Sequence, residues 1–385
     1  MYKMRLFTPG PTPVPESVLL TTAQPVKHHR HREFREIFAE HNRLLGYLFQ
    51  TEQPVLTLTA SGTGAMEAAV LHAMRRGAKA LYVEAGKFGQ RWGEILCAYG
   101  LEAVPLSVPW GEAPDEAQLE AALCAHPDVR AVFLTHSETS TGTWMDVRAL
   151  SRVVRQRAPD ALVVVDGITA VGALELYMDS WDLDIVITAS QKGIMAPPGL
   201  AYIALSERAW KQARESDLPR YYFDLFAALA AYERGDTPWT PAVSLIAGVR
   251  EALRRIAEEG LEQVWDRHAR LARALRAGLL AMGLKLASRR PSNATTAVWL
   301  PEGMGWESLN EALKRRGITV AEGQGPWKGR VFRISHLGYY DPLDMVAVVA
   351  ALEDALRELG YPVEPGVGVA ETQRVLLQVD METGS

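Results

Sequence analysis

The 385-residue chain is too long for one ordinary core and suits a large domain plus a smaller one. Its apolar share of 48% and charged share of 23% are typical of a globular protein, and its net charge of −5 provides no basic field for nucleic acid or an anionic membrane. No apolar run approaches the ~18–20 residues of a membrane span, and the N-terminus has no signal-peptide core. Two cysteines, Cys97 and Cys124, form neither a disulfide framework nor a metal cluster, so we expect a cytoplasmic protein.

The N-terminal region combines an extended arm with a basic cluster. Three prolines and a glycine in residues 7–13 exclude a helix there and predict a turning, extended segment. Apolar positions with helical spacing follow from Phe34 to Phe49. The cluster between these segments is either a solvated face or a contact for a carboxylate or phosphate, and it contains His28, His29 and Arg30.

A strand, a turn of small residues and a helix are predicted in succession for residues 55–74. Backbone N–H groups and the helix dipole at such a turn attract a phosphate, and glycine lets the anion approach closely. Many connections between a strand and a helix are rich in glycine, so the pattern alone is also compatible with an ordinary turn.

Two further turns after predicted strands carry candidate ligand contacts. After the strand at 80–84, Phe88 lies between glycines on a predicted turn, where its ring suits stacking on a planar ligand better than filling a core. The neighbouring Arg91 is expected to brace this loop rather than to touch a substrate. After the strand at 131–134, the hydroxyl-rich residues 135–142 either cap a helix or contact a ligand.

A stretch in the middle of the chain carries the clearest chemistry. Two short apolar runs, Ala161–Val165 and Asp184–Ala189, predict parallel strands buried on both faces. They are followed by Asp166 and by the segment that contains Lys192, at the strand ends where open α/β sheets bind ligands. Pyridoxal 5′-phosphate (PLP) needs such a pair, because the lysine forms the Schiff base and the carboxylate keeps the pyridine nitrogen protonated. For either residue alone, a helix cap or a solvated loop lysine is the simpler interpretation.

The C-terminal third is predicted to form a smaller set of helices and strands. Helices are expected at Val243–Glu259 and Leu261–Met282, and the first ends close to the presumed domain boundary. In the strand pattern within residues 329–338, Arg333 lies on the face opposite to its apolar neighbours. A guanidinium there is a natural clamp for a carboxylate, whereas the plain alternative is an exposed salt bridge.

Six of these segments resemble, in the same order, those of the class V aminotransferases, specifically the alanine–glyoxylate and serine–pyruvate aminotransferase group. They are TPGPTPVP at 8–15, SGTGAMEAA at 61–69, GKFGQR at 86–91, THSETSTG at 135–142, SQKGIMAPPGL at 190–200 and GRVFRISHLG at 329–338. The resemblance implies an α/β protein of PLP-dependent fold type I, with a mostly parallel sheet of the seven-stranded type. It further implies a large PLP-binding domain at 17–255 and a smaller α/β domain made of residues 1–16 and 256–362. The tail at 363–385 departs from the family pattern.

The resemblance also implies roles for individual residues and no metal. Lys192 would carry PLP, Asp166 would pair with the pyridine nitrogen, and Arg333 would bind the substrate carboxylate. Further cofactor contacts are implied for Ser61, Gly62 and Thr63 at the phosphate, Phe88 stacked on the ring, Thr139 in place of the commoner Ser, Gln191 beside the lysine, and Thr240 of the neighbouring subunit at the phosphate. The active sites would therefore be shared within a homodimer. Thr237 stands where human-type relatives have Tyr, so the resemblance does not extend to a second phosphate contact from that loop.

The activity that the resemblance implies is transfer of an amino group from a small amino acid, alanine or serine, to glyoxylate or pyruvate by a ping-pong mechanism. Phosphoserine and aspartate stay open as donors, because four residues are candidates to contact a second anion: His28, His29, Arg30 and His336. A PLP-dependent lyase of the cysteine desulfurase or kynureninase type is the next class. A desulfurase needs a nucleophilic cysteine late in the chain, whereas both cysteines precede Lys192. A scaffold protein would leave Lys192 and Arg333 without a purpose.

Overall fold

The computed structural model describes residues 2–382 and contains a seven-stranded sheet with the order β2-β10-β9-β8-β5-β3-β4. Strand β10 runs antiparallel to both of its neighbours, and the other neighbouring pairs are parallel. In sheet order the strands are β2 (Val55–Leu58), β10 (Ala201–Leu205), β9 (Ile185–Ala189), β8 (Leu162–Asp166), β5 (Val129–Thr135), β3 (Lys79–Glu84) and β4 (Glu102–Ser107). The predicted α/β class and mostly parallel sheet are confirmed.

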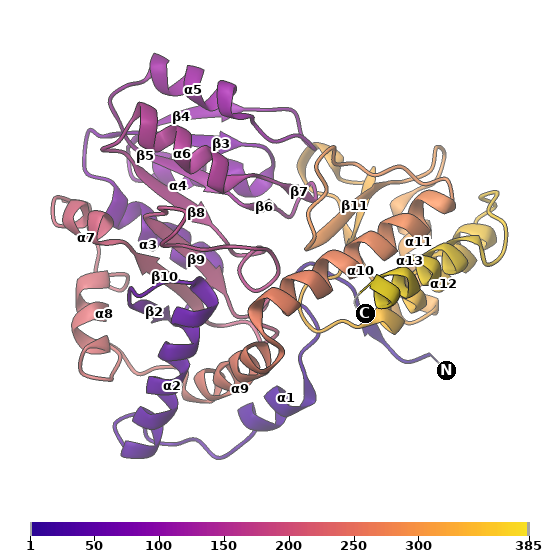
Figure 1. Ribbon diagram of the computed structural model, residues 1–385, viewed down its shortest axis with the longest axis horizontal. Coiled ribbons are helices and arrows are strands. Elements are labelled where there is room, and N and C mark those ends of the chain that lie inside the picture. The colour runs from indigo at the N-terminus through magenta and orange to yellow at the C-terminus, as the bar shows by residue number, and fades with distance from the viewer. Residues whose placement is uncertain (1, 383–385) are drawn as a thin grey trace.

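Helices cover both faces of the sheet (Figure 1), because successive side chains of a strand point to opposite faces. In β8, Val163 and Val165 join one hydrophobic cluster, whereas Leu162 and Val164 join another. Helices α1 (Glu16–Thr22), α2 (Arg32–Phe49), α5 (Glu116–Ala125), α6 (Val147–Arg157) and α9 (Val243–Glu259) contribute to the first cluster, and α3 (Gly62–Ala73), α4 (Lys87–Ala98), α7 (Glu207–Ala213) and α8 (Leu225–Tyr232) to the second. Both faces of the sheet are thereby buried. A ligand can therefore reach the sheet only at the ends of its strands, and in open α/β sheets it binds at the carboxyl ends.

A third hydrophobic cluster joins the N-terminal arm to the C-terminal third of the chain. Phe7 is one of its buried members, and β1 (Arg5–Leu6) pairs in parallel with β12 (Ile318–Thr319). The other elements of this part are α10 (Leu261–Ala281), β11 (Thr295–Trp299), α11 (Trp306–Arg315), β13 (Ala321–Glu322), the 3₁₀ helix η1 (Gly325–Trp327), β14 (Val331–Ser335), α12 (Pro342–Glu358) and α13 (Val367–Glu382). In Figure 1 these orange and yellow elements lie beside the sheet and its helices. The exact domain limits stay a prediction.

The C-terminal tail, for which the sequence offers no interpretation, contains helix α13 and packs on α10 and α12. Thr372 and Leu376 are buried there, and Leu376 belongs to the third cluster. Gly278 of α10 allows this close approach, because a Cβ at that position would collide with the Thr372 hydroxyl. The described part of the tail is therefore an integral layer of the core.

One local prediction is wrong: residues 86–92 do not form an open turn, because α4 begins at Lys87. Gly89 serves packing rather than a turn, since a Cβ there would collide with the Val83 carbonyl oxygen of β3. Two short strands, β6 (Ser137–Glu138) and β7 (Thr143–Trp144), form a separate antiparallel pair after β5. Within residues 2–382, no helix has both the length and the apolar character needed to cross a membrane.

Candidate active site

Eight of the predicted site residues surround one cavity of about 250 Å³ at the carboxyl ends of β2, β5, β8 and β9. They are Ser61, Gly62, Thr63, Phe88, Thr139, Asp166, Gln191 and Lys192. The sheet therefore collects side chains that are far apart in the sequence at the edge where parallel strands end.

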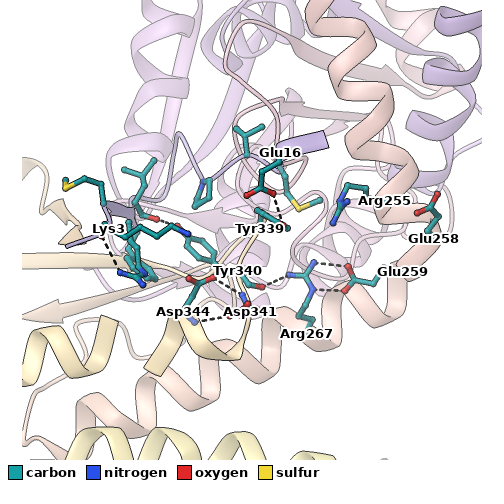
Figure 2. A pocket seen from close by; sticks show the side chains of 17 residues that line it. Lys3, Glu16, Arg255, Glu258, Glu259, Arg267, Tyr339, Tyr340, Asp341 and Asp344 are labelled. Atoms are coloured by element: carbon teal, nitrogen blue, oxygen red, sulfur yellow. Dashed lines mark hydrogen bonds and ion pairs between the residues drawn. The ribbon is translucent and has the colours of Figure 1, made fainter. Parts of the chain in front are cut away.

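A larger cavity, of about 810 Å³, lies between the arm, α9 and α10, and several of its polar groups are engaged with one another. Figure 2 shows that the Arg267 guanidinium pairs with both carboxylate oxygens of Glu259 and that the Tyr339 hydroxyl faces Glu16. Neither Lys192 nor Asp166 lines it. We therefore place the candidate active site in the smaller cavity.

Asp166 ends strand β8 and lines the cavity with a carboxyl group that is only 4% exposed. Its Oδ1 accepts a hydrogen bond from the backbone N–H of Ile168 at 2.8 Å. Burial raises the pKa of Asp166 to about 7, and the negative charge of Glu138 acts in the same direction. A protonated ring nitrogen beside this carboxyl group would favour its ionised form.

Lys192 lies in the turn after β9, and the N-terminal arm crosses directly over it. The Lys192 Nζ donates a hydrogen bond to the carbonyl oxygen of Pro9 at 2.5 Å, and the Thr12 N–H donates to the Gln191 carbonyl oxygen at 3.2 Å. A Cβ on Gly10 would lie 2.5 Å from Nζ, so any larger residue here would displace the end of the Lys192 side chain. Burial lowers the pKa of Lys192 to about 8, and the positive charge of Arg333 contributes. The amine therefore loses its proton more easily than an ordinary lysine does.

Helix α3 points its first turn into the cavity. Its N-cap residue, Ser61, makes no side-chain capping hydrogen bond, and the first N–H groups of a helix lack intrahelical partners. Gly62 lets the Ile168 side chain pack against the first turn of α3, because a Cβ there would lie 2.6 Å from the Ile168 Cδ1 atom. The Gln191 side chain lines the same cavity, and its buried Oε1 atom has no hydrogen-bond partner within the described chain. These unmet polar groups fit a polar ligand with an anionic end.

Phe88 lines the cavity from the first turn of α4, one helical turn before Arg91. The Arg91 guanidinium lies 4.9 Å from the Phe88 ring centroid and donates a hydrogen bond to the Thr63 hydroxyl at 3.1 Å. Arg91 also lines the cavity, which the sequence interpretation missed. The i, i+3 spacing of Phe88 and Arg91 would have indicated it, had the segment been predicted as a helix.

Thr139 lines the cavity, and Arg333, which does not line it, contacts Thr139 from a distant part of the chain. The Thr139 hydroxyl shares a hydrogen bond with the Thr169 hydroxyl at 2.7 Å, and the Thr139 carbonyl oxygen accepts one from Arg333 at 3.1 Å. The other guanidinium donors of Arg333 bind the Glu322 carbonyl oxygen at 2.9 and 2.7 Å. Arg333 is thus 6% exposed on β14 and held by backbone carbonyls rather than by a surface salt bridge. Burial lowers its pKa to about 10.

The remaining predicted residues lie outside this cavity. Thr240 is exposed in the loop before α9 and shares a separate hollow with His28 and His29, while Arg30 is exposed on the same loop as these histidines. His336 is fully buried, and its ring nitrogens bind the Thr296 hydroxyl and the Asn293 carbonyl oxygen, both at 2.9 Å. The prediction that His336 contacts a second anion is therefore wrong, because its polar atoms are already engaged in the core.

Residues 5–336 match the family described as aminotransferase class V. The chain belongs to the class V aminotransferases. It is 43% identical to the soluble hydrogenase small subunit of Synechococcus sp. over 97% of this chain and 98% of that protein. Identity is 36% to the L-aspartate–glyoxylate aminotransferase of Paracoccus denitrificans and 34% to the serine–glyoxylate aminotransferase of Methylorubrum extorquens, each over 96% of this chain and 95% of the relative.

Solved structures bear out the predicted fold type I. An aspartate aminotransferase of Thermus thermophilus superposes with a TM-score of 0.87 at 36% identity, over 92% of this chain and 99% of that chain. The chain is therefore an enzyme of the aminotransferase family, with the glyoxylate-type members among its relatives.

Proposed function

We propose that this class V aminotransferase binds PLP in the 250 Å³ cavity through Lys192 and moves the amino group of a small amino acid to glyoxylate or pyruvate. One observation carries the proposal: an easily deprotonated lysine, a buried carboxyl group and a helix N-terminus open on the same cavity. These groups match the aldehyde, the ring nitrogen and the phosphate of PLP. The buried Gln191 Oε1 atom without a partner adds to the fit.

When bound, PLP supplies an electron-withdrawing ring that makes the Cα–H of an attached amino acid acidic. With its pKa near 8, Lys192 suits the removal and return of that proton near neutral pH. Asp166 holds a proton on the ring nitrogen by its negative charge. Arg333 orients the substrate carboxylate by exchanging its backbone carbonyl partners for the two carboxylate oxygens.

Alanine or serine is the proposed donor. The cavity of about 250 Å³ would have to hold both PLP and the donor, which supports a donor with a small side chain. Aspartate is the second candidate, supported by the names of the Paracoccus and Thermus relatives. His28 and His29 lie beside Thr240, and Arg30 follows them on the same loop. A homodimer in which Thr240 reaches the neighbouring cavity would therefore bring these basic groups toward a second carboxylate. Phosphoserine would use the same groups. The proposed enzyme is a cytoplasmic homodimer.

The experiment is an absorption titration of the protein reconstituted with PLP. Alanine, serine, aspartate and phosphoserine are added separately, followed by glyoxylate or pyruvate. Loss of the yellow colour with alanine or serine, and its return with the keto acid, is the expected result. Conversion by aspartate alone would establish the second candidate and exclude the first. A yellow protein that no donor converts would favour the lyase class, and a protein that PLP cannot turn yellow would contradict the proposal.

A further inference from the structure

The N-terminus of helix α4 is capped by side chains that come from β6 and the turn after it. Its own N-cap residue is Gly86, which has no side chain to accept a hydrogen bond. Instead, the N–H groups of Phe88 and Gly89 donate to one carboxylate oxygen of Glu138, at 3.0 and 2.9 Å. The N–H of Lys87 donates to the Ser140 hydroxyl at 2.9 Å. Three N–H donors of the first turn are thus satisfied from the segment after β5.

This tertiary cap is tightly built. Glu138 and Ser140 are both buried, and the second carboxylate oxygen of Glu138 accepts from the Ser140 hydroxyl at 2.5 Å and from the Ser140 N–H at 3.0 Å. A Cβ on Gly86 would lie 2.5 Å from both the Glu138 Cγ and the Ser140 Oγ atoms, so glycine is needed for the approach. Burial raises the pKa of Glu138, while the hydrogen bonds from Ser140, Gly89 and Phe88 and the dipole of α4 favour its ionised form.

The cap lies between two groups that line the cavity. On one side, the capped turn carries Phe88, whose ring also receives the Arg91 guanidinium. On the other side, Thr139 stands between Glu138 and Ser140, lines the cavity and accepts from Arg333 through its carbonyl oxygen. Glu138 and Ser140 accept hydrogen bonds from the first turn of α4, whereas Thr139 between them lines the cavity. The segment 138–140 therefore fixes the separation of Phe88 and Thr139.

We propose that Glu138 and Ser140 are positioning residues that hold the Phe88 ring at the height required to stack on the planar ring of the cofactor. The inference rests on the proposed function, since it concerns the ligand of the same cavity. If the cap served only the stability of α4, its removal would lower the melting temperature, and its effect on ligand affinity would not depend on Phe88. A positioning role predicts that Glu138 acts on ligand affinity through Phe88.

The test is a double-mutant cycle on PLP affinity with Glu138→Gln and Phe88→Leu. Glu138→Gln keeps the side-chain shape and one acceptor oxygen but removes the charge and one acceptor. Each single substitution should weaken PLP binding about two- to tenfold, the range expected for one aromatic stacking interaction. The double variant should bind PLP as weakly as Phe88→Leu, within about twofold, because the stacking can be lost only once. Full additivity, or unchanged affinity in Glu138→Gln, would overturn the inference.

Two further variants separate local from global effects. Glu94→Gln is the matched control, because Glu94 lies on the same helix and pairs with the side-chain ammonium of Lys87, which takes no part in the hydrogen bonds of the cap. It should leave PLP affinity unchanged, and a loss equal to that of Glu138→Gln would count against the cap. If Glu138→Gln fails to fold, Ser140→Ala replaces it in the same cycle. Amide hydrogen exchange of residues 87–89 without PLP should accelerate in the cap variants and not in the control. Wild-type protein that does not bind PLP would refute the proposed function, whereas binding with additive losses refutes the positioning role alone.

Discussion

The pKa of Lys192 gives the sharpest quantitative prediction. A lysine with its usual pKa of 10.5 is unprotonated in about one molecule in a thousand at pH 7.5, whereas a pKa of about 8 makes that fraction about a quarter. Only the unprotonated amine reacts with an aldehyde. The rate at which PLP combines with the PLP-free protein should therefore rise about tenfold per pH unit below pH 8 and level off above it.

The assay is stopped-flow absorbance from pH 6 to 10, with Nα-acetyllysine at equal PLP concentration to correct for ionisation of PLP itself. Burial is the main cause of the lowered pKa, Arg333 adds to it and Asp166 opposes it. Arg333→Gln should therefore move the midpoint of the rate to higher pH, Asp166→Asn should move it to lower pH, and Arg333→Lys should leave it nearly in place. A wild-type rate that continues to rise beyond pH 9.5 would refute this account of the lysine.

Three further outcomes are expected, two of them from the comparison of a site position with a control position. Gly10→Ala should weaken PLP binding, because the added methyl group would displace the end of the Lys192 side chain. Gly303→Ala, which also has a positive φ but open space around it, should retain the affinity in the same titration; equal losses would contradict the proposed fit of the arm. Leu376→Ala should lower the free energy of unfolding by about 2–5 kcal/mol in urea and the 65% exposed Leu377→Ala by almost nothing; similar values would place α13 outside the core. The free energy of unfolding should fall as the pH drops from 6.5 toward 4, by about 1.4 kcal/mol per pH unit for each buried histidine. The reason is that these histidines bind a proton in the unfolded chain but stay neutral in the folded protein. Equal free energies of unfolding in urea titrations at pH 7 and pH 5 would contradict it. The histidines concerned have pKa values lowered by burial to about 4 or 3, and they are His41, His72, His136 and His268.

Strands and turns in the middle of the chain were predictable, because their signals are local. Continuous β-branched runs predicted β8 and β9, and the residues that follow them, Asp166 and Lys192, share one cavity because neighbouring parallel strands end at the same edge. The helix α9 matches its predicted bounds, since its apolar spacing is unbroken.

The failures concern interactions between distant segments. Gly86 and Gly89 suggested a turn, but both serve close contacts of α4, one with Glu138 and the other with β3. His336 resembled a free basic group because the partners that engage its ring, on β11 and before it, are about 40 residues away. The sequence pattern allowed residues 135–142 to cap a helix but did not indicate α4, since the Glu138 carboxylate and the N–H donors of α4 are about 50 residues apart.

The central claim is that PLP is held by Lys192, one of nine lysines in the chain. The most direct measurement is borohydride reduction of the protein reconstituted with PLP, followed by proteolysis and mass spectrometry of the peptides. The account predicts a pyridoxyl phosphate group on the peptide that contains Lys192, and none when the reaction is repeated with Lys192→Ala. A label on another lysine, or a label that persists in the variant, would contradict it.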